Sequence, residues 1–218
     1  MRFLTKRRAL TGLICLLTVC VIVVPAGAQS SSTQQPSGRG EQREGQPTLG
    51  KGRTELGVFL GAANTVTHFH LPGDHHFATV MLEWGRVVTR RRGAPPPLAG
   101  HLEMLVEVLP ILVMTQSERA YGAGVMPVLL RWIFDQPERV RPFLDVGGGV
   151  LATDRKVPEK TARFNFMAHA SAGLRVRVDE RRSLLLGYRW HHISNGNLVT
   201  SNPGINSHMF YMGVSVLR

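Results

Sequence analysis

Apolar and polar residues alternate with a period of two along much of the second half of the chain. The longest run is 164–178, in which every even-numbered position is Phe, Ala, Leu or Val. Successive side chains of a β-strand point to opposite faces, so this run predicts a strand with one apolar and one mainly polar face. The polar face carries Asn165, Met167, His169, Ser171, Gly173, Arg175 and Arg177.

Segments of this kind recur after residue 54, and clusters of turn-forming residues separate them. Most are longer than the roughly five or six residues that are usual for strands of soluble proteins. We predict eight strands, over 55–63, 76–88, 101–114, 120–134, 142–153, 162–178, 183–195 and 206–217.

Charged residues occur in the middle of these segments, which a membrane-spanning barrel explains better than a soluble sandwich. Such a barrel is apolar toward lipid and polar inside, and its closure leaves no strand edge unpaired in hydrocarbon. We therefore predict an all-β fold, an eight-stranded antiparallel transmembrane β-barrel of the outer-membrane type, with a soluble periplasmic barrel as the alternative. Small barrels are filled by side chains, so the inward charges predict a buried polar network rather than a channel. They are Glu83, Glu103, Glu107, Asp145, Arg175, Arg177 and Arg189.

Residues 1–28 have the features of an export signal. A basic start is followed by the apolar run "ALTGLICLLTVCVIVV" and by "PAGAQS", which predicts cleavage after Ala28. Both cysteines, Cys15 and Cys20, lie in this signal, so we expect no disulfide and no thiol nucleophile in the mature chain. Export and a membrane barrel together predict a location in the bacterial outer membrane.

Residues 29–53 contain almost no apolar side chains, which predicts a disordered periplasmic tether ahead of a barrel over 54–218. Removal of the signal lowers the formal net charge from +11 to +7, because four basic residues leave with it. A basic surplus suits contact with an anionic surface. For an exported chain that surface is a membrane rather than nucleic acid. The alternatives for its assembly are a monomer and a homodimer.

The stretch "YRWHHISNGNLVTSNPGIN" (188–206) places polar groups on the lipid-facing side of two neighbouring strands. If Tyr188 and Trp190 face lipid, as interfacial aromatic residues do, then His192 and Ser194 share their face. The same reasoning on the last strand brings Asn206 to this face. With both chain ends in the periplasm, this polar group lies at the outer rim. It is either a nucleophile with its base and an orienting residue, or a set of headgroup contacts.

"HISN" (192–195) followed by "NPGIN" (202–206) resembles the motif of the outer-membrane lipid A 3-O-deacylases, an acyloxyacyl hydrolase-like family of eight-stranded barrels. The resemblance implies an esterase in which His192 is the general base and Ser194 is the nucleophile. It also implies that Asn195 helps to form the oxyanion hole, with the amide of Gly196 or Asn197 as a second donor.

One position departs from the family pattern. The third member of the triad is a Glu in the best-known members, and the matching position here is Asn206. An Asn can hold the tautomer of the histidine, but it supplies no negative charge to the imidazolium. We therefore expect a carboxylic ester hydrolase of weakened activity. The alternatives are an esterase for phospholipid and a non-catalytic barrel that binds lipid A or a partner.

No cofactor is expected, because ester hydrolysis by a serine needs none. "HFHLPGDHHF" (68–77) holds four histidines and an Asp, and imidazole suits zinc and copper. The Pro-Gly in its middle favours a plain loop, so no metal site is predicted there. The predicted substrate is lipid A of lipopolysaccharide, at the outer leaflet.

Overall fold

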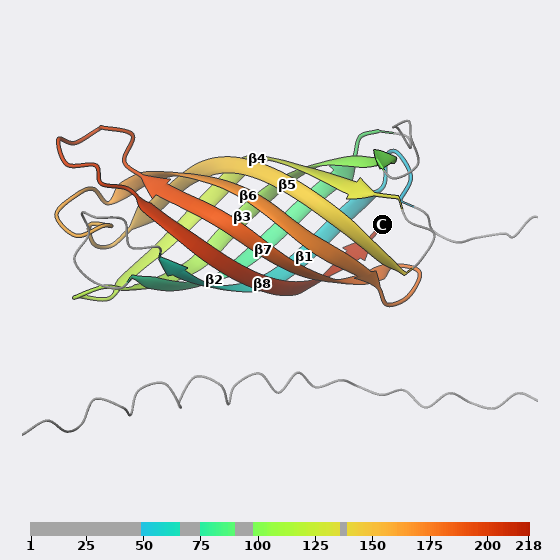
Figure 1. The fold of residues 1–218 in the computed structure, drawn as a ribbon, viewed down its shortest axis with the longest axis horizontal. Helices are drawn as coiled ribbons and strands as arrows, with labels where there is room; N and C mark the ends of the chain where they lie inside the picture. The colour runs from blue at the N-terminus through green and yellow to red at the C-terminus, as the bar shows by residue number, and fades with distance from the viewer. Residues whose placement is uncertain (1–48, 66–74, 90–97, 136–138) are drawn as a thin grey trace, which may run out of the picture. The chain divides into compact units, whose positions relative to one another are not determined.

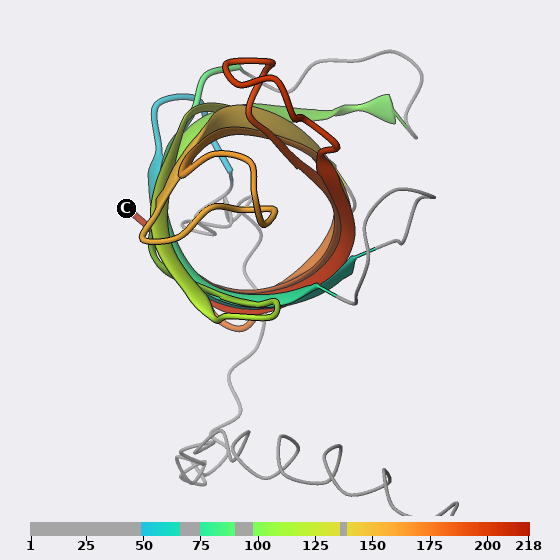
Figure 2. The ribbon, with the colours of Figure 1, turned by 90° about the vertical axis from the view of Figure 1, so that its left-hand side faces the viewer.

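The computed structural model describes residues 49–65, 75–89, 98–135 and 139–218. Within these ranges each strand runs antiparallel to its two neighbours, and the first strand pairs with the last to close a barrel (Figure 1). The closed ring is seen end-on in Figure 2. The predicted fold class is confirmed. The strands are β1 (Thr54–Thr65), β2 (His76–Val87), β3 (Gly100–Thr115), β4 (Ala120–Phe134), β5 (Val140–Thr153), β6 (Phe164–Arg177), β7 (Arg182–Ser194) and β8 (Ile205–Leu217).

Each strand overlaps the segment predicted for it, and the bounds differ by no more than two residues. In the described ranges no helix has both the length and the apolar character needed to cross a bilayer. The predicted signal, 1–28, and most of the predicted tether lie outside the described residues. The end of the tether does not behave as predicted: Leu49 is buried, and the Gly52 amide donates to the Val87 carbonyl oxygen at 2.8 Å.

The outer wall of the barrel is apolar, as the alternation predicts. On β8 the outward Phe210 is 69% exposed, whereas its neighbours Met209 and Tyr211 are buried inside. On β6 the outward Phe164 and Phe166 are exposed in the same way. An apolar outer surface around a closed barrel is the arrangement that a bilayer requires.

The inside of the barrel holds ion pairs between distant strands. Arg189 of β7 donates two hydrogen bonds to Glu107 of β3, both at 2.8 Å. Arg131 of β4 donates two to Glu83 of β2, both at 2.9 Å, and a third to Asp145 of β5 at 3.2 Å. Paired carboxylates and guanidinium groups of this kind offset the cost of removing charge from water. Six of the seven predicted inward charges are buried, and Arg177, at the barrel end, is half-buried.

Two register shifts along β3 and β4 change which face a residue joins. One lies between Leu109 and Leu112, and another between Val125 and Val128. Strict alternation along β3 would place Leu112 on the outer face with Met104 and Val108, but the structure buries it completely inside. A β-bulge inserts a residue into one strand and so reverses the faces beyond it. Arg131, which follows the shift on β4, is buried inside for the same reason and was not predicted.

The β7–β8 connection lies at the end of the barrel opposite the C-terminus (Figure 1). The β5–β6 connection lies across the opening at this same end (Figure 2). Val157 and Thr161 of that connection are buried, and the Val157 amide donates to the Ala162 carbonyl oxygen at 2.8 Å. A folded loop therefore closes the barrel beside the candidate site.

Candidate active site

Strands β7 and β8 bring a histidine and an asparagine into direct contact on the outer wall. His192 and Asn206 are register partners, and His192 Nδ1 lies 2.7 Å from Asn206 Oδ1. The amide oxygen can only accept, so Nδ1 carries the proton and Nε2 keeps its lone pair. A neutral imidazole with a free Nε2 is the form that a general base requires.

Ser194 lies on the same outward face, two residues beyond His192. It is half-buried, and its register partner is Phe166 of β6. Among the described residues no hydrogen bond joins the Ser194 hydroxyl to His192. Hydrogen bonds between a nucleophile and its base are often long without substrate and shorten when substrate binds. The structure therefore brings His192 and Asn206 together and leaves Ser194 beside them.

Two neighbours fix the plane of the His192 ring. The Trp190 ring is stacked on it, with centroids 6.1 Å apart and planes inclined by 16°. A Cβ at Gly204 would lie 3.1 Å from His192 Cε1. Gly204 has a φ of +66°, a conformation that favours glycine. The Pro203–Gly204 turn thus leaves room beside the imidazole that another residue would take.

The chain turns sharply after Ser194. Gly196 and Asn197 both have positive φ, at +60° and +62°, and the Leu198 amide donates to the Asn195 carbonyl oxygen at 3.1 Å. This pattern is that of a type I′ turn. A Cβ on Gly196 would lie 2.8 Å from the Phe166 ring. Within the described residues no hydrogen bond uses the amides of Gly196 and Asn197, which leaves two donors next to the serine.

Asn195 is placed differently from the role that the resemblance implied. Its side chain is buried, in the inward register, and its amide nitrogen donates to the Ser201 carbonyl oxygen at 2.7 Å. Its backbone amide donates to Asn202 Oδ1 at 3.0 Å. These bonds tie the two ends of the β7–β8 connection together. In this structure Asn195 shapes the loop and points away from the face of Ser194.

Aromatic side chains cover the outer wall below the polar rim. Tyr188 and His208 are hydrogen-bonded through the Tyr188 hydroxyl and His208 Nδ1, and their rings are stacked. Phe210 packs on Tyr188 with centroids 5.4 Å apart. Because the polar atoms of this pair satisfy each other, the surface is suited to an acyl chain.

No group of three or more potential metal ligands occurs in the described part of the chain. Most of the histidine-rich stretch 68–77 lies outside the described residues, including His68, His70 and Asp74. Of the remainder, His76 Nδ1 lies 2.9 Å from Asn64 Oδ1, which is a contact between neighbouring strands.

Sequence reasoning missed several residues that shape the site. Trp190 was assigned to the lipid interface, yet its ring also orients His192. Gly204 and Asn202 were noted only as parts of the "NPGIN" motif, with no role of their own. The spacing of Trp190 two residues before His192, on the same strand face, was a signal that could have revealed the first contact.

Comparisons with known proteins place this geometry in context. The model of the family described as lipid A 3-O-deacylase (PagL) matches residues 79–215, more than half of the chain. The crystal structure of the outer membrane enzyme PagL is similar, with a TM-score of 0.55 and 17% identity over 73% of this chain and 97% of that one. OprG from Pseudomonas aeruginosa is also similar, with a TM-score of 0.46 and 7% identity over 78% and 98%. At 17% identity the PagL structure shows the fold alone. No curated protein sequence matched.

Proposed function

Because this chain belongs to the lipid A 3-O-deacylase family, we propose that it is a serine-type esterase that removes an ester-linked 3-hydroxyacyl chain from lipid A. The observation that carries the proposal is the 2.7 Å contact between His192 Nδ1 and Asn206 Oδ1, beside Ser194 on the outer wall. A base already held in the productive tautomer next to a hydroxyl is the arrangement of a nucleophilic serine.

The first half of the reaction forms an acyl-enzyme. Ser194 Oγ attacks the ester carbonyl carbon while His192 Nε2 takes the hydroxyl proton, and the carbonyl oxygen becomes an oxyanion. The amides of Gly196 and Asn197 are the donors that we assign to this oxyanion, because they have no other partner among the described residues. Fixed donors of this kind lower the barrier without reorganisation.

The intermediate then collapses. The bond between the carbonyl carbon and the sugar oxygen breaks, and His192 returns its proton to that oxygen. Water, deprotonated by His192, next attacks the acyl group on Ser194, and the serine recovers its proton as the acid leaves. The products are a free 3-hydroxy fatty acid and lipid A with one chain fewer.

We assign the site to the outer leaflet. The polar residues lie at one end of the barrel, and the exposed aromatic surface of Tyr188, Trp190 and Phe210 continues below them toward the middle of the strands. An ester bond of lipid A lies just below its headgroup, at the boundary between such polar and apolar surfaces. His192 and Ser194 are therefore at the depth that the substrate requires.

The test is mass spectrometry of lipid A from cells that express the protein or its Ser194→Ala variant. We expect the native protein to remove the mass of one hydroxyacyl chain, and the variant to leave lipid A intact. Ser201→Ala, an exposed serine of the same connection, is the matched control and should act like the native protein.

Three other outcomes would contradict the proposal. Unchanged lipid A with both folded proteins would favour a non-catalytic barrel that binds lipid. Loss of acyl chains from phospholipid instead would show that the substrate is different. Equal activity in Ser194→Ala would exclude the serine as the nucleophile.

A further inference from the structure

The end of the barrel far from the candidate active site has two arginine pairs on its inner face. Arg141 of β5 and Arg175 of β6 are register partners. The next pair toward the opening is Arg139 and Arg177, because the Arg177 amide donates to the Arg139 carbonyl oxygen at 2.9 Å. Like charges directly opposite each other in an antiparallel sheet are destabilising. Two successive pairs therefore call for compensation by negative charge.

The protein supplies that charge to only part of the cluster. Arg175 lies 2.5 Å from a carboxylate oxygen of Glu55 and 3.8 Å from one of Glu103. Arg141 reaches Asp135 only at 3.8 Å. Arg139 and Arg177 have no carboxylate within salt-bridge distance among the described residues.

Two further acids, Asp179 and Glu180, line the same opening, together with a fifth arginine, Arg181. Asp179 accepts hydrogen bonds from the backbone amides of Arg181 and Arg182, and its second oxygen accepts one from the Arg182 side chain. Its salt bridge is with Arg182, and no salt bridge joins it to Arg139 or Arg177 within the described residues. Five arginines and two carboxylates therefore line the barrel opening, which leaves it with an excess of positive charge.

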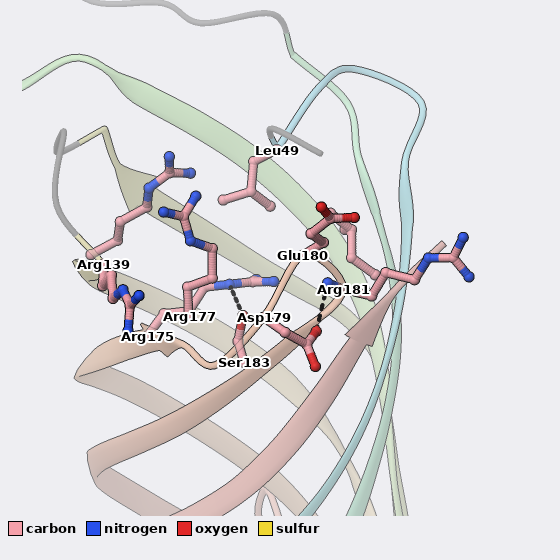
Figure 3. A pocket seen from close by; sticks show the side chains of 10 residues that line it. Leu49, Arg139, Arg175, Arg177, Asp179, Glu180, Arg181 and Ser183 are labelled. Atoms are coloured by element: carbon pink, nitrogen blue, oxygen red, sulfur yellow. Dashed lines mark hydrogen bonds between the residues drawn. The ribbon is translucent and has the colours of Figure 1, made fainter. Parts of the chain in front are cut away.

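The arginines surround a small cavity. Its volume is about 30 Å³, and besides the five arginines and two acids its lining has Leu49, Ser183 and Leu217. Figure 3 shows Arg139, just before β5, beside Arg175 and Arg177 of β6 at this opening, with Leu49 close by. The cavity has room for about one water molecule. An anion would thus be held at its opening by guanidinium groups rather than enclosed.

We propose that Arg139, Arg141 and Arg177 bind a phosphate group at this end of the barrel. The planar fork of guanidinium donors matches phosphate oxygens, and several arginines together can neutralise a phosphate. The phosphate is either free in solution or part of a phospholipid headgroup. The site lies at the opposite end of the barrel from Ser194, so it does not depend on the esterase activity.

The test measures thermal unfolding of the complete barrel in an uncharged detergent. One arm compares sodium phosphate with sodium chloride at equal ionic strength. The second uses phosphatidylcholine nanodiscs with and without phosphatidylglycerol. We expect phosphate or phosphatidylglycerol to raise the unfolding temperature, and Arg139→Gln/Arg177→Gln to weaken the apparent affinity at least tenfold. Arg163→Gln, at the other end of the barrel, is the matched control and should retain the effect.

The two arms identify the source of the phosphate. A rise with sodium phosphate in detergent assigns a free phosphate, whereas a rise only with phosphatidylglycerol assigns a lipid headgroup. Without any phosphate, the double variant should unfold at the same temperature as the native barrel or higher, because two like-charge pairs are relieved. If the double variant fails to fold, Arg139→Gln replaces it, since that side chain is exposed. No rise in either arm, or an equal rise in the variant, would overturn the proposal.

Discussion

Arg189 and His192 lie three residues apart on β7 and face opposite sides of the barrel wall, and their partners differ in kind. Inside, Arg189 is completely buried and meets both carboxylate oxygens of Glu107 at 2.8 Å. Outside, His192 is half-buried and meets the neutral amide oxygen of Asn206 at 2.7 Å. The inner pair joins two opposite full charges, whereas in the outer pair a neutral amide orients the histidine.

The difference follows from what surrounds each group. A guanidinium group shut inside the barrel cannot lose its charge, so only a well-placed carboxylate can offset its desolvation. His192 needs only one tautomer to act as a base, and a neutral acceptor supplies that. A neutral acceptor has a disadvantage later in the reaction, because the imidazolium then forms with no carboxylate beside it to stabilise its charge.

Breaking the inner pair should have the largest effect. Arg189→Met leaves Glu107 buried without its partner, and we expect a loss of about 3–5 kcal/mol in the free energy of unfolding. Urea unfolding of the barrel in lipid vesicles measures it. The double variant Arg189→Met/Glu107→Leu should recover most of the loss, because no uncompensated charge remains. An unchanged unfolding midpoint in the single variant would show that the pair is not needed.

Giving the outer site the charge that it lacks should have the next largest effect. Asn206→Glu is expected to raise the rate of acyl release about a hundredfold, because a carboxylate stabilises the imidazolium. The rate is measured on lipid A by mass spectrometry at fixed times. Asn206→Ala is the control and should lower the rate. A Glu variant no faster than the native protein would mean that the neutral acceptor already suffices.

Moving the imidazole without changing its partner sharpens the comparison further. Gly204→Ala places a Cβ 3.1 Å from His192 Cε1 in a backbone with a φ of +66°. We expect roughly a tenfold slower acyl release, because small displacements of a base raise the barrier. Gly148→Ala is the control, since its Cβ would have only ordinary contacts. Equal rates for the two variants would contradict the role of Gly204.

The smallest effect is expected for Asp179, in the exposed turn between β6 and β7. Its carboxylate is neither buried nor part of the candidate active site. Hydrogen bonds from the backbone amides of Arg181 and Arg182 lower the pKa of Asp179 to about 2. A lowered pKa contributes stability at neutral pH, and that stability is lost as the pH falls from about 4 through about 2. Asp179→Asn should therefore unfold slightly more easily than the native protein at pH 7, by a margin that shrinks toward pH 2, which thermal unfolding at the two pH values measures. If the unfolding temperatures of the variant and the native protein differed by the same amount at pH 7 and pH 2, titration of Asp179 would not be the cause.

Much of the fold could be predicted from the sequence, because the alternation of apolar and polar residues is a property of each strand alone. The eight segments, and the faces of β6 and β8, follow from side chains that alternate along one strand. The shared face of His192 and Ser194 is local in the same way. Leu112 and Arg131 were not predicted correctly because bulges in β3 and β4 reverse the faces, and no single residue announces a bulge.

The sequence by itself determined the strands, the two faces of each strand that has no bulge, and the residue types at the rim. Only the tertiary structure decided which charges meet, because the partner of Arg189 lies 82 positions earlier in the chain. It also decided that Asn195 ties the loop while Asn206 holds His192. The physical reason is that alternation depends on one strand, whereas these contacts depend on the register and closure of all eight strands.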